Sequence, residues 1–417
     1  KKYPQSAYTG LQRSLQMKWQ YVQRVTRECG DDFMAIEKAI STIFLPALFD
    51  VDIDEDDLVL QLACLPVKFA GLALPAPTTS AKLNYDASIQ HTSHLTACFR
   101  GVDTFRTADH SAVIQTNRAE LRARSSFRHS SRLDALLRQM PSAKRRIILR
   151  GKDTGTFLQV LPSVVNGTVL SAEEFRDGLL LRSGMEIQNL PSHCDGCGKP
   201  SSINHALECP TGGNTIIRHN DVKYAVADFA IRAFGSSAVR DEPRIFPCRP
   251  AAPQETPAPS NTRTRVPDTD LRGDLCIRNL WAKSTDGIID ICVIDTDAKS
   301  YRDRDPLKVL ESHERKKKKK YLDACLGQRR HFTPFAVSVD GLLGKEAKTL
   351  LQRLSGLLAK KWDKPYASVC GYVKASMSLA ILRATHRCIR GSRIPTSRMS
   401  SDFPQWEDQA GLGLFRF

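Results

Sequence analysis

The sequence predicts a mixed α+β or α/β protein, in which a helical N-terminal region and a short cysteine-rich segment precede a mixed sheet flanked by helices. Three observations support this fold class. Apolar residues recur at helical spacing through the first 110 residues, four Cys and His side chains fall within residues 194–209, and apolar runs typical of strands alternate with helical patterns after residue 270. We therefore expect segments 1–110, 111–185, 186–212 and 213–391, with an irregular tail over 392–417.

The composition indicates a globular protein with a polyanionic partner. The chain has 417 residues, 41% of them hydrophobic, which predicts two or three domains with a real core. Sixty-one Lys and Arg against 45 Asp and Glu give a net charge of +16, which favours nucleic acid, although a solvated basic surface is the alternative. No apolar run approaches the roughly 20 residues of a membrane span, so no membrane partner is expected.

The ends of the chain and its cysteines set further expectations. The N-terminus has neither a signal-peptide pattern nor an initiator Met, so we expect a piece of a longer protein. Twelve scattered cysteines favour a reducing compartment, free thiols and one metal site over a disulfide framework.

Residues 1–110 are expected to be mostly helical and to carry no chemistry. Leu11, Leu15 and Trp19 begin a helical pattern, and the turn-rich stretch 65–75 interrupts the helices. The acid pairs at 31–32 and 56–57 lack the preceding aromatic residue of a polymerase metal site, so we interpret them as surface acids.

The second segment, 111–185, is predicted to be a basic helical connector. Between Arg118 and Lys152 it carries 11 Lys or Arg against two acids, and Pro141 ends one helix before the next begins. The candidate nucleic-acid-binding residues are Arg118, Arg122, Arg132, Lys144, Arg145 and Arg146. A solvated helix packed on the N-terminal region is the alternative.

The third segment, 186–212, contains the spacing Cys194-x2-Cys197-x7-His205-x3-Cys209. Two cysteines two residues apart can face one ion, and a His and a Cys one helical turn apart supply two more ligands of a closed tetrahedral site. Gly196 and Gly198 permit the tight turn that the first pair needs. The sequence therefore predicts a structural Zn²⁺ knuckle, since so short a segment has little core of its own.

The last segment is predicted to alternate strands and helices. A helix should start near Asn220 or Asp221, and the proline-rich stretch 246–262 is expected to be a disordered insertion. Strands follow at 274–277, 288–294 and 331–340, with helices at 306–326, 344–362 and 368–388. The order strand, helix, strand predicts a parallel crossover.

Two carboxylates and a lysine-rich helix are the candidate catalytic groups. Asp290 lies within a strand that is otherwise apolar on both faces, where a lone carboxylate is costly unless a cation or a proton neutralises it. Asp274 opens the preceding strand, and lysines 316–320 lie on the following helix. Hydrolysis of a phosphodiester can use two such carboxylates to hold Mg²⁺ and a lysine to orient water. The alternative for Asp290 is a structural ion pair with Lys or Arg.

Taken together, the knuckle, Arg272-Gly-Asp-Leu275, Ile288-Ile-Asp-Ile-Cys-Val293 and the helix ending in Lys320-Tyr321 resemble the C-terminal end of non-LTR retrotransposon polyproteins that carry a restriction-like endonuclease. The stretches 335–344 and 65–75 are similar to other parts of the same region. The resemblance spans nearly the whole chain, but only the knuckle and the nuclease motifs are specific. It implies that residues 1–110 follow a polymerase whose active site is absent here, and that 213–391 adopt a restriction-endonuclease-like fold.

The resemblance also assigns roles to residues. The family's Lys/Arg-Pro-Asp motif falls on Arg272, Gly273 and Asp274, with Gly in place of Pro, and its second Asp falls on Asp290. Its lysines fall on Lys317 and Lys320, and Arg272 joins the nucleic-acid-binding set. A competing assignment uses Pro267-Asp268 with Asp297-Ala298-Lys299, which we rank second because these last residues are expected in a loop.

The implied function is an endonuclease that nicks target DNA in the nucleus to prime copying of the element's RNA. Target DNA, element RNA, structural Zn²⁺ and catalytic Mg²⁺ are the implied partners and cofactors. The alternative is a non-catalytic, zinc-containing nucleic-acid-binding module, decayed or domesticated. The sequence leaves the target site, the oligomeric state and the acting lysine open.

Overall fold

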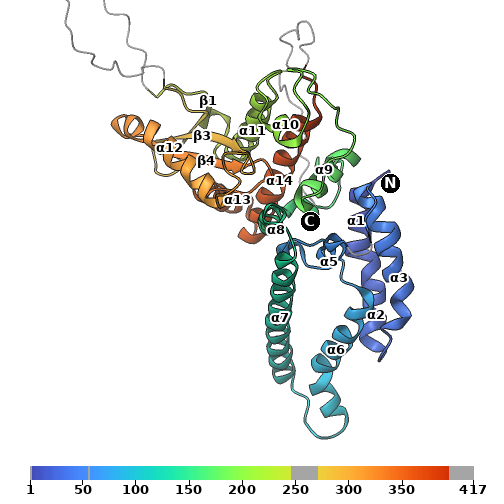
Figure 1. Ribbon diagram of the computed structural model, residues 1–417. Coiled ribbons are helices and arrows are strands. Elements are labelled where there is room, and N and C mark those ends of the chain that lie inside the picture. Colours follow the sequence, from blue (N-terminus) through green and yellow to red (C-terminus); the bar gives the residue numbers. More distant parts are fainter. Residues whose placement is uncertain (1, 55–56, 246–270, 394–417) are drawn as a thin grey trace, which may run out of the picture. The chain divides into compact units, whose positions relative to one another are not determined.

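The computed structural model describes residues 2–54, 57–245 and 271–393 (Figure 1). Residues 2–189 and residues 190–393 each form a compact unit. The boundary that we predicted at 110/111 falls inside helix α7 (Thr107–Arg138), and the predicted knuckle and sheet segments belong to one unit. The insertion predicted at 246–262 and nearly all of the predicted tail lie outside the described residues.

The first unit is helical, as predicted from its periodicity. A buried connector, 65–74, links its helices, and helices α6 and α7 form a long hairpin (Figure 1). The helices are α1 Pro4–Gly10, α2 Gln16–Val25, α3 Met34–Ala39, α4 Leu45–Phe49, α5 Leu58–Ala63, α6 Pro77–Phe99, α7 Thr107–Arg138, α8 Ser142–Thr154 and α9 Ala172–Ser183. One-turn 3-10 or π segments lie at Leu11–Leu15, Asp31–Phe33, Ile40–Phe44, Val67–Phe69 and Thr156–Gln159.

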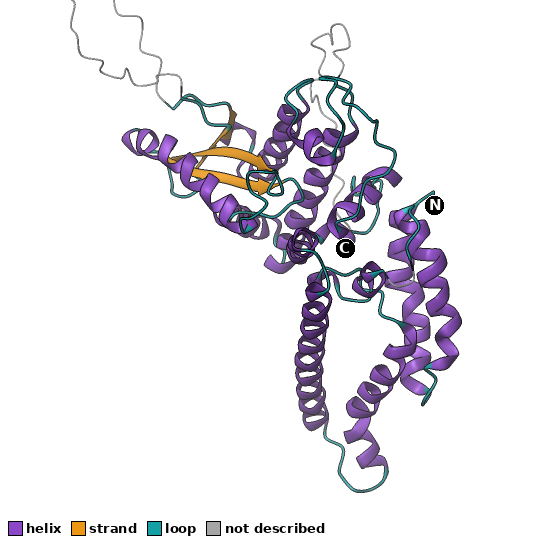
Figure 2. Ribbon diagram, in the orientation of Figure 1, coloured by secondary structure: helices purple, strands orange, loops and turns teal. Residues whose placement is uncertain are grey.

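The second unit contains a four-stranded mixed sheet with helices on both faces (Figure 2). The strands lie in the order β1-β2-β3-β4, with β3 parallel to β4 and the other pairs antiparallel. Their bounds are β1 Val239–Asp241, β2 Leu275–Arg278, β3 Asp286–Ile294 and β4 His331–Ser338. The helices are α10 Ile203–Glu208, α11 Asn214–Phe234, α12 Pro306–Gly327, α13 Lys345–Trp362 and α14 Tyr366–Arg390, with a 3-10 turn at Ser236–Ala238.

Alternate residues of β3 pack against different helices, because successive strand side chains point to opposite faces. Ile289 and Ile291 pack in a core with residues of α11, α13 and α14. Ile288 packs with Tyr321 of α12 on the other face. Strand β3 is therefore central and covered on both faces, as its apolar sequence predicted.

Two details differ from the sequence prediction. Helix α11 begins at Asn214, not at Asn220 or Asp221, after Gly213 in the left-handed region at φ 73°. Strand β1 was not predicted, since its three residues carry no alternating apolar pattern and are defined by their pairing with β2.

Candidate functional sites

The predicted zinc ligands come together at one point. The ligand atoms of Cys194, Cys197, His205 and Cys209 all lie within 4.8 Å of one another. Cys197 Sγ is 3.3 Å from His205 Nε2, and the Cys194 and Cys209 sulfurs are 3.9 Å apart. A Cys3His set of this size can hold a metal such as zinc in tetrahedral geometry.

Two glycines and a helix cap position the ligands of this cluster. Gly198 adopts φ 71°, and a side chain at Gly196 would meet Arg393 Cβ at 2.7 Å, so the sequence needs both glycines. The Ser202 hydroxyl caps α10 by accepting from the His205 backbone N–H. Burial raises the pKa of the Cys194 thiol, but hydrogen bonds from Cys197 and His205 outweigh it and lower the pKa to about 6. The thiolate that zinc requires is therefore favoured at this position.

The cluster is attached to the helices of the sheet. The Arg393 backbone N–H and the Ser392 hydroxyl both donate to Asp195 Oδ2, at 2.8 and 3.0 Å. The buried Arg393 guanidinium donates to Ala206 O at 2.9 Å, and Asn214 at the start of α11 donates to Gly391 O. The first residues of the predicted tail thus connect the Cys3His cluster to α14.

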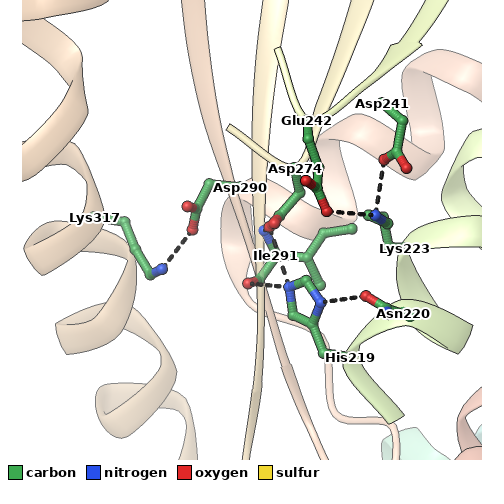
Figure 3. Close-up of polar contacts among 9 residues, drawn as sticks. All are labelled: His219, Asn220, Lys223, Asp241, Glu242, Asp274, Asp290, Ile291 and Lys317. Carbon is green, nitrogen blue, oxygen red and sulfur yellow. Dashed lines mark hydrogen bonds and ion pairs between the residues drawn. The ribbon is translucent and has the colours of Figure 1, made fainter. Parts of the chain in front are cut away.

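The predicted carboxylates occupy facing positions on adjacent strands. The Asp274 N–H donates to Ile289 O immediately before β2, which places Asp274 beside Asp290 in β3. Both acids, with Lys317 and His219, line a cleft of about 480 Å³ (Figure 3). The fold therefore brings together Asp274, Asp290 and Lys317, which lie far apart in the sequence.

Asp290 and Lys317 form an ion pair inside this cleft. Asp290 is 4% exposed, and its Oδ2 lies 2.7 Å from Lys317 Nζ of α12. Among the residues that the structure describes, no donor meets hydrogen-bond geometry at Asp290 Oδ2. Burial raises the pKa of Asp290, the Asp274 charge raises it further, and Lys317 opposes both. A cation among these acids would therefore stabilise the charged form of Asp290.

Asp274 is held by a histidine that the sequence analysis did not select. His219 Nε2 lies 3.2 Å from both Asp274 Oδ2 and Ile291 O, and the Ile291 N–H donates to the same Oδ2 (Figure 3). Burial raises the pKa of Asp274, but the His219 and Ile291 hydrogen bonds outweigh it, so the pKa is lowered. Asp274 Oδ1 has no hydrogen-bond partner within the described ranges.

A third carboxylate, Glu242, also lines the cleft, although the sequence did not predict it there. Its N–H donates to Asp274 O just beyond β1, and its backbone adopts φ 44°. Its Oε1 lies 3.6 Å from the Nζ of Lys223, a buried lysine whose main partner is Asp241 at 2.8 Å. No sequence signal marked Glu242, because it reaches the cleft only through the unpredicted pairing of β1 with β2.

Only one of the two candidate lysines reaches the carboxylates. Lys317 pairs with Asp290, whereas Lys320 is exposed and lies over the Tyr321 ring, 4.8 Å from its centroid. Arg272 lines the cleft. In the competing assignment, Pro267 and Asp268 lie outside the described residues, and Asp297 and Lys299 follow β3 in a turn that does not line the cleft.

The basic candidates of the first unit divide into exposed and structural side chains. Arg118 and Arg122 are exposed on α7, and Arg132 is exposed with a hydrogen bond to Gln61. Arg145 instead donates to Leu137 O and Met140 O at the end of α7, which is a structural role. Lys144 and Arg146 are partly buried on α8.

The residues of the cleft suit a hard cation in chemical type. Mg²⁺ is commonly held by one or two carboxylates and several waters, and Asp274 and Asp290 supply oxygens of that kind. In the described part of the chain, the Cys3His cluster is the one group of three or more Cys, His, Asp or Glu side chains that could share an ion.

No helix among the described residues is long and apolar enough to span a bilayer.

Comparison with known proteins gives no assignment. No protein-family model matches the chain, and no curated protein matches it. The function must therefore be argued from the residues of the cleft and the cysteine cluster.

Proposed function

We propose that this chain is the metal-dependent DNA endonuclease and nucleic-acid-binding part of a retrotransposon polyprotein, and that it nicks target DNA to prime reverse transcription. The observation that carries the proposal is the cleft that Asp274 and Asp290 line from adjacent strands, where Lys317 of the next helix pairs with Asp290. A central strand with a buried acid, followed by a helix that carries the lysine, is also the arrangement that a restriction-like fold would use. The net charge of +16 suits a polyanionic substrate.

In this proposal each side chain has a distinct task. Asp274 and Asp290 would hold Mg²⁺, which when bound would polarise the phosphate and lower the pKa of a water molecule. Lys317 is placed to orient that water and to stabilise the negative charge that develops on the phosphate. His219 orients Asp274 through its Nε2–H, leaving Asp274 Oδ1 for the cleft.

The test is nicking of supercoiled DNA by the full chain in Mg²⁺. We expect Asp290→Asn to abolish nicking, with a loss of at least about 100-fold, while DNA binding persists. Asp297→Asn is the matched control, because it removes an acid of the competing assignment that does not line the cleft. Retained nicking in Asp290→Asn, or lost nicking in Asp297→Asn, would defeat the assignment.

One observation favours the non-catalytic alternative. Asp290 already has a cationic partner in Lys317, so the pair can serve as a buried structural ion pair. A non-catalytic nucleic-acid-binding module would bind zinc and show salt-sensitive DNA binding, yet cut no DNA in Mg²⁺ or Mn²⁺. The same plasmid assay decides between the two functions.

A further inference from the structure

A second, basic pocket lies on the same sheet as the carboxylate cleft. It has a volume of about 430 Å³ and contains four guanidinium groups and one carboxylate. Its charged residues are Arg240 of β1, Arg278 of β2, Asp286 of β3, and Arg329 and Arg330 after α12. Four positive charges against one negative charge leave the pocket with a net charge of +3.

The four arginines divide into two pairs with different surroundings. Arg240 lies 2.6 Å from Asp286 Oδ2, and Arg330 lies 3.9 Å from the same atom while it donates to Arg244 O and Ile245 O. These two arginines are therefore engaged within the fold. Arg278 and Arg329 are exposed, and neither side chain has a hydrogen bond or an ion pair to any residue that the structure describes.

The register of the strands fixes the distance from this pocket to the cleft. Arg278 faces Asp286 in the β2–β3 pair, whereas Asp274 lies beside Asp290 at the other end. Arg278 lies four residues after Asp274, and Asp290 lies four residues after Asp286. Each of these distances is about 13 Å at roughly 3.3 Å per residue. That length corresponds to about four base steps of a duplex at ~3.4 Å per step.

We propose that this pocket, with Arg278 and Arg329 as its contacting groups, binds a backbone phosphate of the DNA whose scissile phosphate lies in the carboxylate cleft. Guanidinium groups recognise phosphate oxygens through paired, charge-assisted hydrogen bonds, which explains why one pocket holds two arginines without a partner among the described residues. Asp286 holds Arg240 and Arg330 in place on the pocket wall. The inference rests on the proposed function for the identity of the polyanion.

The first test is DNA binding by the full chain in the Asp290→Asn background without added Mg²⁺, so that no cutting is required. Arg278 and Arg329 contact one phosphate, and each lost phosphate contact lowers the slope of log K against log salt by about 0.9, so Arg278→Ala/Arg329→Ala should lower it by about 0.9. Binding at about 0.1 M salt should weaken by up to roughly 8-fold, which is the same slope change expressed at that salt concentration.

A matched control removes the same charge elsewhere. Lys360→Ala/Lys374→Ala takes two exposed lysines from α13 and α14, outside the pocket, and should change the slope little. Arg278→Lys/Arg329→Lys keeps the charge and should restore most of the salt slope. An alanine double variant that matches wild type, or that changes no more than the lysine control, overturns the proposal.

A second test locates the bound phosphate. Neutral methylphosphonate linkages are placed singly along the duplex, and one about four base steps from the nick should weaken nicking by wild type but not by the alanine double variant. Equal effects on both proteins would overturn the placement. The two proposals fail separately: a changed salt slope without any nicking keeps the phosphate site and removes the nuclease, whereas nicking with an unchanged slope does the reverse.

Discussion

At the scale of single residues, the cleft distinguishes between two lysines that the sequence leaves equivalent. Lys317 touches Asp290, whereas Lys320 stacks on Tyr321 and is exposed. We predict that Lys317→Met lowers the nicking rate by about 100-fold or more, because it removes the cation beside the reacting phosphate. Lys320→Met carries the same change three residues away and should stay within a few-fold of wild type in the same plasmid assay. If the two variants lose activity equally, the lysines act only through net charge.

The contact between His219 and Asp274 predicts a defined pH dependence of stability. The hydrogen bond to Asp274 raises the pKa of His219 above its usual value, although burial opposes this, and the pKa of Asp274 is lowered. The His219 contribution is fully present below the unfolded histidine pKa and disappears as pH rises through the raised folded value. The Asp274 contribution is present above the unfolded Asp pKa and disappears as pH falls through the lowered folded value.

The pair should therefore stabilise the fold most at mildly acidic pH, between the unfolded pKa of Asp, ~3.9, and the unfolded pKa of His, ~6.5. A double-mutant cycle with His219→Gln and Asp274→Asn, measured by urea unfolding without Mg²⁺, should give a coupling free energy of about 1.5–3 kcal/mol at pH ~5.5. The coupling should shrink as pH rises through the raised pKa of His219 and the imidazolium deprotonates. A coupling that grows with pH would show that the pair has the opposite charge state.

At the scale of elements, the sequence predicted those strands, helices and ligand sets whose pattern lies within one segment of the chain. The apolar run of β3, the helical repeat of α13 and the spacing of the four zinc ligands each contain their own signal. Glu242 and His219 carried no such signal. Glu242 reaches the cleft because the short strand β1 pairs with β2, and His219 because α11 starts at Asn214 and packs on the sheet. Both placements follow from tertiary packing, which periodicity does not record.

The Cys3His cluster is linked to helix α11, so loss of one of its ligands should also affect that helix. Four residues separate Cys209 from the start of α11, and Asn214 is tied to Gly391 beside Arg393. We predict that Cys209→Ser abolishes stoichiometric zinc binding and lowers amide protection in α10 and the first turns of α11, since a bound metal would supply much of the local folding free energy. Zinc assay and hydrogen exchange measure both effects. Cys64→Ser, in the first unit, should leave zinc content unchanged; unaltered protection of α11 in Cys209→Ser would show that the helix does not depend on the metal.

At the scale of the whole molecule, the first unit is organised around a buried arginine that its sequence did not mark. Arg182 of α9 is 5% exposed and donates to the carbonyl oxygens of Val67, Ala70, Gly71 and Gly151, at 2.7 to 3.1 Å. Burial lowers the pKa of its guanidinium to about 10. The stretch 65–75, predicted only as a turn-rich connector, is therefore joined to α8 and α9 through one side chain. Composition could not show this, because a buried arginine and a surface arginine contribute equally to a net charge of +16.

The last prediction tests this organisation. Arg182→Met keeps the apolar stem but removes one donor from each of four carbonyl groups, of which Val67 O keeps the Ala70 N–H. The cost is about 1–3 kcal/mol for each buried group that is left without a donor and that water cannot reach. We expect a total destabilisation of roughly 3–5 kcal/mol, which is about 6–20 °C in melting temperature for a unit of this size. Arg122→Met, on an exposed side chain of α7, is the control and should change stability by less than about 0.5 kcal/mol. Hydrogen exchange should show the loss of protection in 65–74 and in α8, whereas the carboxylate cleft and the cysteine cluster, which belong to the other compact unit, should keep theirs. Equal loss of protection in both units would mean that they unfold as one cooperative body.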